Sequence, residues 1–311
     1  MPPPGIMKSY IIKRLLQSII VILGVSLIVF FILHLTGDPA ALLLPLDATQ
    51  EDIDRFRQEM GFDDPIIIQY FRFLKNALRG DFGKSLKHAQ PALGLVLERL
   101  PATIELTLFS LFLAILVSFP AGIISAIKKG TIYDYIAMTF ALIGQSIPIF
   151  WLGLMLILFF SVYLHLLPVS GRGGLSHLIL PSVSIALYSS AALTRLIRSN
   201  FIEVMHADYI RTARAKGVSE FKVIMKHALR NASIPVVTML GLQFATLLGG
   251  AVITETIFAW PGVGRLAIQA VYNRDYPLVQ AVVFVVALTF IVINIIIDII
   301  YTYLDPRIKY N

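Results

Sequence analysis

The sequence of 311 residues contains no cysteine and little charge, with only 14% of its residues charged, against about 25% in ordinary soluble proteins. The missing cysteines exclude disulfides, thiolate catalysis and zinc sites of the cysteine type. Six histidines are present, but no two are four residues apart, so they predict no metal site. Because 57% of the residues are hydrophobic, the composition disfavours a water-soluble globule.

The apolar residues are concentrated in six long stretches that contain no Asp, Glu, Lys or Arg. A helix needs about 20 apolar residues to cross the hydrocarbon core of a bilayer, and uninterrupted stretches suit helices, whereas barrel strands alternate over about 10 residues. The sequence therefore predicts an all-α integral membrane protein with six transmembrane helices. These cover residues 15–35, 106–127, 136–164, 178–194, 231–254 and 276–297.

The distribution of basic residues predicts the topology. Segments 1–14, 128–135, 195–230 and 298–311 contain 15 Lys and Arg, whereas 165–177 and 255–275 contain three. Basic loops stay inside, so we expect both termini and the loop 195–230 in the cytoplasm. The net charge of +7 then reflects topology, and no nucleic acid partner is expected. The first stretch is too long for a cleaved signal peptide and lacks an A-x-A site.

The segment 36–105 is predicted to form an extracytoplasmic subdomain with short helices. Thr49 and Asp52 form a candidate capping box for one amphipathic helix. Asp64-Pro65 is typical of the start of a second helix, which we expect to end at Gly80. The pattern leaves open whether this subdomain is a solvated cap or docks a partner.

None of the six stretches has an Asp, Glu, Lys or Arg that could couple transport to an ion, which disfavours an ion-driven carrier. We expect prolines to interrupt four of the stretches and produce kinks or half-helices. These are Pro120, Pro148, Pro181 and Pro235. An intramembrane protease is also disfavoured, because the histidines lie at the ends of the stretches or in loops.

Small and polar residues within the stretches predict helix contacts. Gly241, Ala245 and Gly249 repeat every four residues and predict a helix-packing face. Three amide side chains are candidates either for hydrogen bonds between helices or for lining a transport path. They are Gln145, Gln243 and Asn294.

The loop 195–230 carries the most informative segment. Residues 208–216 are predicted to be helical, because Asp208 suits the first turn, basic residues suit the last turn and Gly217 suits the position just past the end. Small residues at Ala213 and Ala215 suit a helix that sits in the groove of another protein. The residues alone leave a second interpretation open, a basic loop attracted to anionic lipid.

The sequence Asp208-Tyr209-Ile210-Arg211-Thr212-Ala213-Arg214-Ala215-Lys216-Gly217, followed by His227-Ala228-Leu229-Arg230-Asn231-Ala232 and Pro235, resembles the permease subunits of binding-protein-dependent ABC importers. The general loop pattern of these permeases is E-A-A-x-x-x-G-x9-I-x-L-P, and Ala213, Gly217 and Leu229 match it. The leading Glu, the Ile and the final Pro of that pattern are absent, as in the peptide and nickel subfamily. Further similarities to the B-type permeases of that subfamily occur along almost the whole chain, in 80–85, 103–108, 167–171, 177–181, 255–264, 274–277 and 305–307.

The resemblance implies the type I ABC importer architecture and an inner-membrane location in a prokaryote. It implies four partner subunits: a second permease, two cytoplasmic ATPases and an extracytoplasmic solute-binding protein. It assigns ATPase coupling to Asp208, Tyr209, Arg211, Thr212, Ala213, Arg214, Ala215, Lys216 and Gly217. The implied solutes are dipeptides, oligopeptides, glutathione, nickel chelates or oligosaccharides. The alternative is a carrier or channel that acts alone.

The resemblance also implies that ATP-Mg is bound by the partners, with no cofactor, metal or catalytic residue in this chain. Gly83-Lys84-Ser85 is similar to the end of a phosphate-binding loop. That loop would need another glycine five residues before Gly83, where this chain has Leu78. We therefore expect no ATP site here.

Overall fold

The computed structural model describes residues 4–35, 49–60, 63–248 and 251–304, and these residues form helices joined by short loops. Within these ranges there is no strand, and one isolated bridge pairs Lys84 with Pro91. The helices are α1 (Pro4–Leu35), α3 (Gln50–Met60), α4 (Ile66–Ala77), α5 (Ala92–Ile127), α6 (Ile132–Ser146), α7 (Ile149–Leu156), η1 (Ile157–Tyr163), α8 (Leu175–Met205), α9 (Asp208–Ala215), α10 (Glu220–Lys222), η2 (Val223–Ala228), α11 (Leu229–Ala232), α12 (Ile234–Leu248), α13 (Val252–Ile257), α14 (Val263–Tyr272) and α15 (Tyr276–Leu304).

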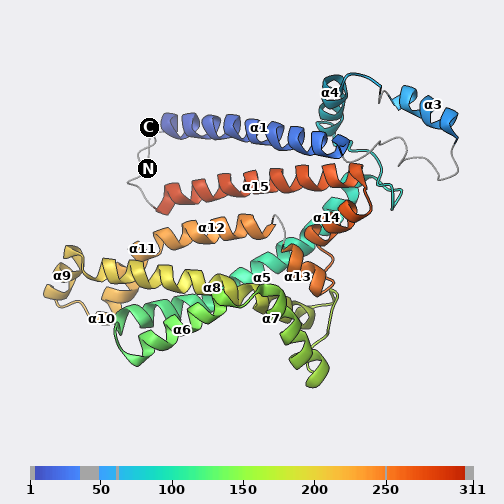
Figure 1. The fold of residues 1–311 in the computed structure, drawn as a ribbon. Coiled ribbons are helices and arrows are strands. Elements are labelled where there is room, and N and C mark those ends of the chain that lie inside the picture. Colours follow the sequence, from blue (N-terminus) through green and yellow to red (C-terminus); the bar gives the residue numbers. More distant parts are fainter. Residues whose placement is uncertain (1–3, 36–48, 61–62, 249–250, 305–311) are drawn as a thin grey trace.

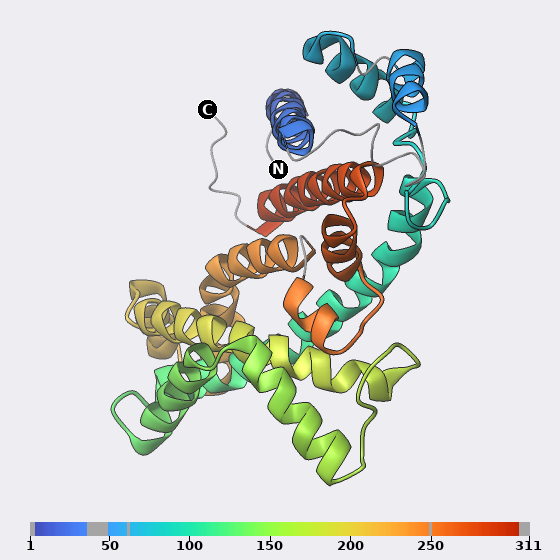
Figure 2. The ribbon, with the colours of Figure 1, turned by 45° about the vertical axis from the view of Figure 1, so that its right-hand side comes forward.

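The long helices form an elongated bundle. α5 packs along α8, α6 covers α8, and α15 packs against both α1 and α12. Figure 1 shows α1, α15 and α12 running side by side, with α8 and α6 below them. The two views place α9 at one end of the bundle and α4 and α14 toward the other (Figures 1 and 2). An ion pair of 3.0 Å between Arg14 and Asp298 joins α1 to α15 at the α9 end.

Three helices, α5, α8 and α15, are long and apolar enough to cross a membrane, and within the described ranges two bent pairs bring the number to five if each pair is one span. The stretch 136–164 is one such pair, in which α6 and the helix 149–163 meet at 98°. Pro148 lies at this bend, and Ile147 before it is extended, because a residue before proline is driven out of the helical region. The second pair, 220–232 and 234–248, bends by 50°.

The other two prolines do not divide the helix that contains them. Pro120 lies inside the continuous helix α5 and Pro181 inside the continuous helix α8. A proline removes one hydrogen bond from the ladder, and the long contact between α5 and α8 keeps both helices intact.

Buried apolar side chains gather at both ends of the bundle and in its middle. One cluster joins the loop residue Phe82 to α5 and α15 at the α14 end. A second joins α8 to α9, η2 and α12, with Phe201, Ile210 and Val223 among its members. A third surrounds Trp260 in the middle. The segment that carries α9 is therefore part of the packed core and does not hang free.

Candidate functional site

Helix α9 covers Asp208–Ala215 and ends in a left-handed glycine, Gly217, with φ of +77°. The Gly217 N–H donates to Arg214 O at 2.9 Å, and the Val218 N–H donates to Ala213 O at 3.2 Å. These two hydrogen bonds define a Schellman motif, which satisfies the last carbonyls of a helix. The structure confirms the predicted helix to within one residue, as well as the predicted position of Gly217.

One face of α9 is buried in the chain itself. Ile210 is fully buried and Ala213 is 8% exposed, and both pack in the cluster that includes Phe201 and Val223. The small side chain of Ala213 therefore lets α9 lie close to its own neighbours. Of the two alanines expected to enter a partner's groove, only Ala215 is exposed.

Two side-chain contacts hold α9 against the following helices. Arg214 donates to both carboxylate oxygens of Glu220 on α10, at 3.1 and 2.6 Å. Asn231 on α11 donates its amide N–H to the Tyr209 hydroxyl at 2.8 Å. The remaining surface is polar and exposed, and it consists of Asp208, Arg211, Thr212, Ala215 and Lys216. We call these five residues the open face of α9.

A buried ion pair binds three helices together near the same end. Arg198 of α8 donates to both oxygens of Asp134 at 2.7 and 2.8 Å. The Gly130 N–H and the Ser125 hydroxyl donate to the same carboxylate. From the sequence, Asp134 falls in the segment 128–135 and Arg198 counts only as a charge of the loop 195–230, so this pair was not predicted.

At the other end, two sequence motifs meet at a buried carboxylate. Asp275, which is 1% exposed, accepts hydrogen bonds from the Ser85 hydroxyl and from the Leu278 N–H at 3.3 Å. This contact joins the loop before α5 to the start of α15. The Ser85 hydroxyl of the Gly-Lys-Ser sequence is thereby engaged inside the protein.

A second buried carboxylate, Glu255, joins α13 and α14 to α5. Thr103 donates its hydroxyl to Glu255 at 2.7 Å and accepts the Val263 N–H at 2.8 Å. The Arg265 N–H donates to Glu255 at 2.9 Å. A Cβ added at Gly262 would overlap this carboxylate, which explains why a glycine stands there.

The predicted packing face lies against α15. Gly241 is buried, and a Cβ placed there would lie 2.5 Å from Ile297 of α15. Ala245 is fully buried, near Ile293. Gly249 lies outside the described residues.

The three candidate path residues are on different helices. Gln145 is exposed at the end of α6, Gln243 is half-buried on α12, and Asn294 is half-buried on α15. Asn294 donates to Phe290 O at 2.8 Å, and the buried Gln243 Oε1 has no hydrogen-bond partner among the described residues. No hydrogen bond within the described part of the chain joins the three amides. Nor do the described residues contain a group of three or more side chains that could hold a metal ion.

Sequence comparison identifies the class of protein. The family described as binding-protein-dependent transport system inner membrane component matches residues 118–310. The corresponding N-terminal family of these membrane components matches residues 7–107. The chain belongs to the family of binding-protein-dependent inner-membrane permeases.

Curated relatives include the glutathione transport system permease protein GsiC of Escherichia coli K12, with 44% identity over 306 residues, 98% of this chain and 100% of the relative. GsiC of Shigella boydii serotype 4 has 43% identity over the same length, again 98% of this chain and 100% of the relative. A solved structure of the MetNI methionine ABC transporter has a TM-score of 0.57 at 20% identity, covering 68% of this chain and 96% of its own. The protein is therefore a permease subunit of an ABC importer in the bacterial inner membrane. These findings do not favour a carrier or channel that acts alone.

Proposed function

We propose that the segment Asp208–Gly217 couples this permease to a cytoplasmic ATPase, in an importer that contains a second permease, two ATPases and a solute-binding protein. The observation that carries the proposal is the construction of α9. Ile210 and Ala213 bury one face in the core, whereas the open face is free to contact another subunit. A helix fixed in this way can transmit motion.

The contacts of α9 give a route for that motion. Its apolar face packs with Phe201 near the end of α8, and Tyr209 and Arg214 connect it to α11 and α10. α11 leads directly into α12. A displacement of α9 by an ATPase would therefore displace the ends of α8 and α12 together.

We assign ATP binding to the partner subunits. The only sequence similar to a phosphate-binding loop lacks its first glycine, and the hydroxyl of its Ser85 is engaged by Asp275. Both termini and α9 would face the cytoplasm. The ion pair between Arg14 and Asp298 at the α9 end supports this arrangement.

The proposed solutes are short peptides, including glutathione. The support is the 44% identity to a permease named for glutathione transport, together with the similarity to the peptide subfamily. Nothing in the described residues selects one peptide, and we place selectivity in the solute-binding protein.

The test is a charge reversal on the open face, Arg211→Glu, in the importer purified through a tag on this chain. The Arg211 side chain is 83% exposed and 3.9 Å from Asp208, so its loss costs the chain little stability. We expect loss of solute uptake, together with loss of the ATPases or of solute-stimulated ATP hydrolysis. Lys129→Glu makes a similar charge change on an exposed loop between α5 and α6 and is the matched control.

Gly217→Asp is a less specific test of the contact with the ATPase. Gly217 has positive φ, so the substitution would also strain the end of α9. Normal uptake by Arg211→Glu, or equal loss in both charge variants, would contradict the assignment. Uptake by this chain alone in vesicles would contradict the importer as a whole.

A further inference from the structure

Helix α4 has three chemically different faces. Tyr70 and Ala77 are buried against the protein. A second face is basic and exposed, with Arg72, Lys75 and Arg79. Between them runs an apolar stripe of Ile67, Phe71, Leu74 and Leu78, spaced by four, three and four residues. Ile67 and Phe71 are each 62% exposed, and Leu78 is 77% exposed.

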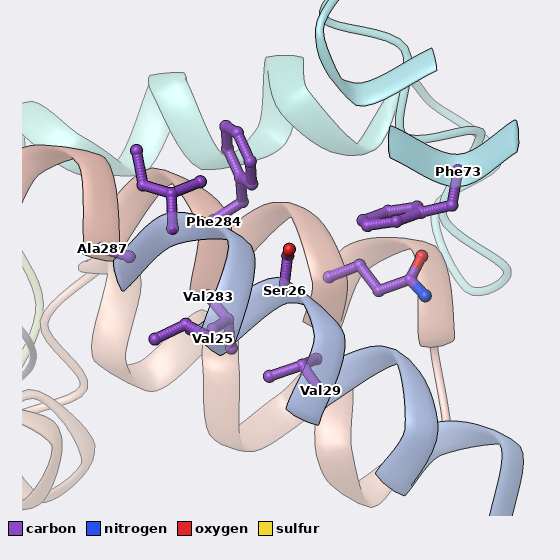
Figure 3. A pocket seen from close by; sticks show the side chains of 9 residues that line it. Val25, Ser26, Val29, Phe73, Val283, Phe284 and Ala287 are labelled. Atoms are coloured by element: carbon purple, nitrogen blue, oxygen red, sulfur yellow. The ribbon is translucent and has the colours of Figure 1, made fainter. Parts of the chain in front are cut away.

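The buried face of α4 fixes its position beside α1. The Tyr70 hydroxyl is 2.9 Å from Ser26 Oγ and 3.2 Å from Leu23 O. The Phe30 ring lies 5.5 Å from the ring of Tyr70 and 5.7 Å from that of Phe73. Figure 3 shows Phe73 beside a cavity of about 10 Å³ that α1 and α15 also line, including Ser26 and Phe284.

These contacts also fix the depth of α4. Leu23 is twelve residues before Leu35, the last residue of α1, which corresponds to about 18 Å of helix. Ser26 and Phe30 lie within the apolar part of α1, Leu16–Ile32. Figure 1 shows α4 transverse to α1 and beside its Leu35 end. α4 is therefore level with part of the membrane span and does not extend far into water.

We propose that α4 lies in the membrane surface at the Leu35 end of α1, with the stripe Ile67, Phe71, Leu74 and Leu78 in contact with lipid acyl chains. Lys75 and Arg79 then reach the phosphate groups of the same lipids, because long basic side chains extend from apolar depth to the polar region. This inference does not depend on the proposed coupling function.

Two features favour lipid over a protein partner as the occupant. The exposed side chains of α1 at the same level are also apolar, with Leu27 40%, Ile28 58% and Ile32 53% exposed, so the surface of α1 at the depth of α4 is suited to acyl chains. Beside the stripe, Lys75 and Arg79 give the helix a cationic edge. An apolar face next to a basic face is typical of helices that lie in a bilayer surface.

The absence of cysteine from the chain allows a direct test. We would introduce single cysteines by Phe71→Cys and Leu78→Cys on the stripe, and by Lys75→Cys on the basic face. Lys84→Cys, at an exposed position in the next loop, is a water-exposed control. Each full chain is labelled with a nitroxide in the assembled importer and reconstituted in phosphatidylethanolamine and phosphatidylglycerol vesicles. The importer with the cysteine-free chain gives the background from the other subunits.

We expect labels at positions 71 and 78 to collide severalfold more often with oxygen, which partitions into acyl chains, than with water-soluble chromium oxalate. The ratio should be reversed at position 84 and intermediate at position 75. A chromium oxalate preference at 71 and 78 would overturn the proposal by placing the stripe in water. Immobile labels shielded from both reagents would overturn it by showing that another subunit covers the stripe.

Discussion

Helices α8 and α15 are similar in length but differ in what surrounds them. In the most apolar 18-residue stretch of each helix, 67% of the residues are buried in α8 and only 22% in α15. α8 is nevertheless the less apolar of the two. Its buried side chains include small polar residues, Ser182, Ser184, Ser189, Ser190 and Thr194. α15 instead exposes an aliphatic stripe of Leu288, Val292, Ile296 and Ile299.

The difference follows from the solvent. Lipid tails are as apolar as leucine, so burial of an apolar side chain between two helices gains little, and close contact through small residues gains more. α8 therefore uses serine and alanine to pack against α5, and α15 presents its aliphatic residues outward. Polarity in this chain marks contacts between helices, whereas high hydropathy marks the surface of the bundle.

The largest effect is expected where α8 pairs with a buried carboxylate of α6. Arg198→Ala leaves Asp134, whose side chain is only 7% exposed, without its ion-pair partner, and loss of one member of a buried pair costs about 3 kcal/mol. Arg172→Ala removes an exposed pair with Glu105 and should cost less than about 1 kcal/mol. Thermal unfolding of the purified importer measures both changes. Equal melting temperatures for the two variants would contradict the greater importance of the buried contact.

A methyl group in the α5–α8 contact should have the next largest effect. A Cβ at Gly122 would lie 2.7 Å from Ile197 and 3.0 Å from the Thr194 carbonyl, so Gly122→Ala must separate the helices, at a cost of about 2 kcal/mol. Gly24 of α1 has no atom within 4 Å of such a Cβ, and Gly24→Ala should be neutral or slightly stabilising. Thermal unfolding of both variants provides the comparison. A Gly122→Ala protein as stable as the Gly24→Ala protein would argue against tight packing of α8.

A smaller effect is expected at the end of α9. Gly217 has φ of +77°, where a side chain costs about 1 kcal/mol, although asparagine tolerates this region better. Gly217→Ala should therefore speed amide hydrogen exchange in 208–218 more than Gly217→Asn does. The same exchange rate in both variants would show that the left-handed conformation is not what limits the stability of this segment.

The smallest effect concerns pH at α3, far from the packed bundle. The Thr49 hydroxyl and N–H donate to Asp52 and lower the pKa of its carboxyl from the ordinary value of 3.8. A lowered folded pKa stabilises the helix above the ordinary value, and this stabilisation is lost as the pH falls through the folded pKa. Relative to the intrinsic exchange rate at each pH, the amide protection of 50–54 should be lower at about pH 3 than at neutral pH. Asp52→Ala should remove this difference, whereas a pH response that persists in Asp52→Ala would have another source.

Local features of the fold were largely predictable from sequence. Thr49 and Asp52 form the expected capping box, since the Asp52 N–H also donates to Thr49 Oγ1 at 3.3 Å. The second short helix begins at Ile66, directly after Asp64-Pro65. It ends at Ala77, three residues before Gly80, which has φ of +78°. Such signals depend on neighbours within one or two turns, so the sequence contains them.

The buried contacts between distant elements were not predictable in the same way. Arg198 and Asp134 are 64 residues apart, and Ser85 and Asp275 are 190 residues apart. Each motif was visible alone, but no local rule paired them. The prolines also show what the sequence alone does not decide, namely whether a helix is divided at a proline. Pro148 lies at a bend between two helices, whereas Pro120 and Pro181 lie in continuous helices supported by packing.

The sequence by itself determined that this is an all-helical membrane protein of the importer permease class, and where the helix before Gly217 begins and ends. Hydropathy, charge distribution and short motifs depend only on the order of residues along the chain. The tertiary structure decided which side of each helix is buried. It turned Ala213 inward, left Ala215 and Arg211 exposed, and placed α4 beside α1 with its apolar stripe exposed. These outcomes depend on which helices meet, and that is set by packing across the whole bundle.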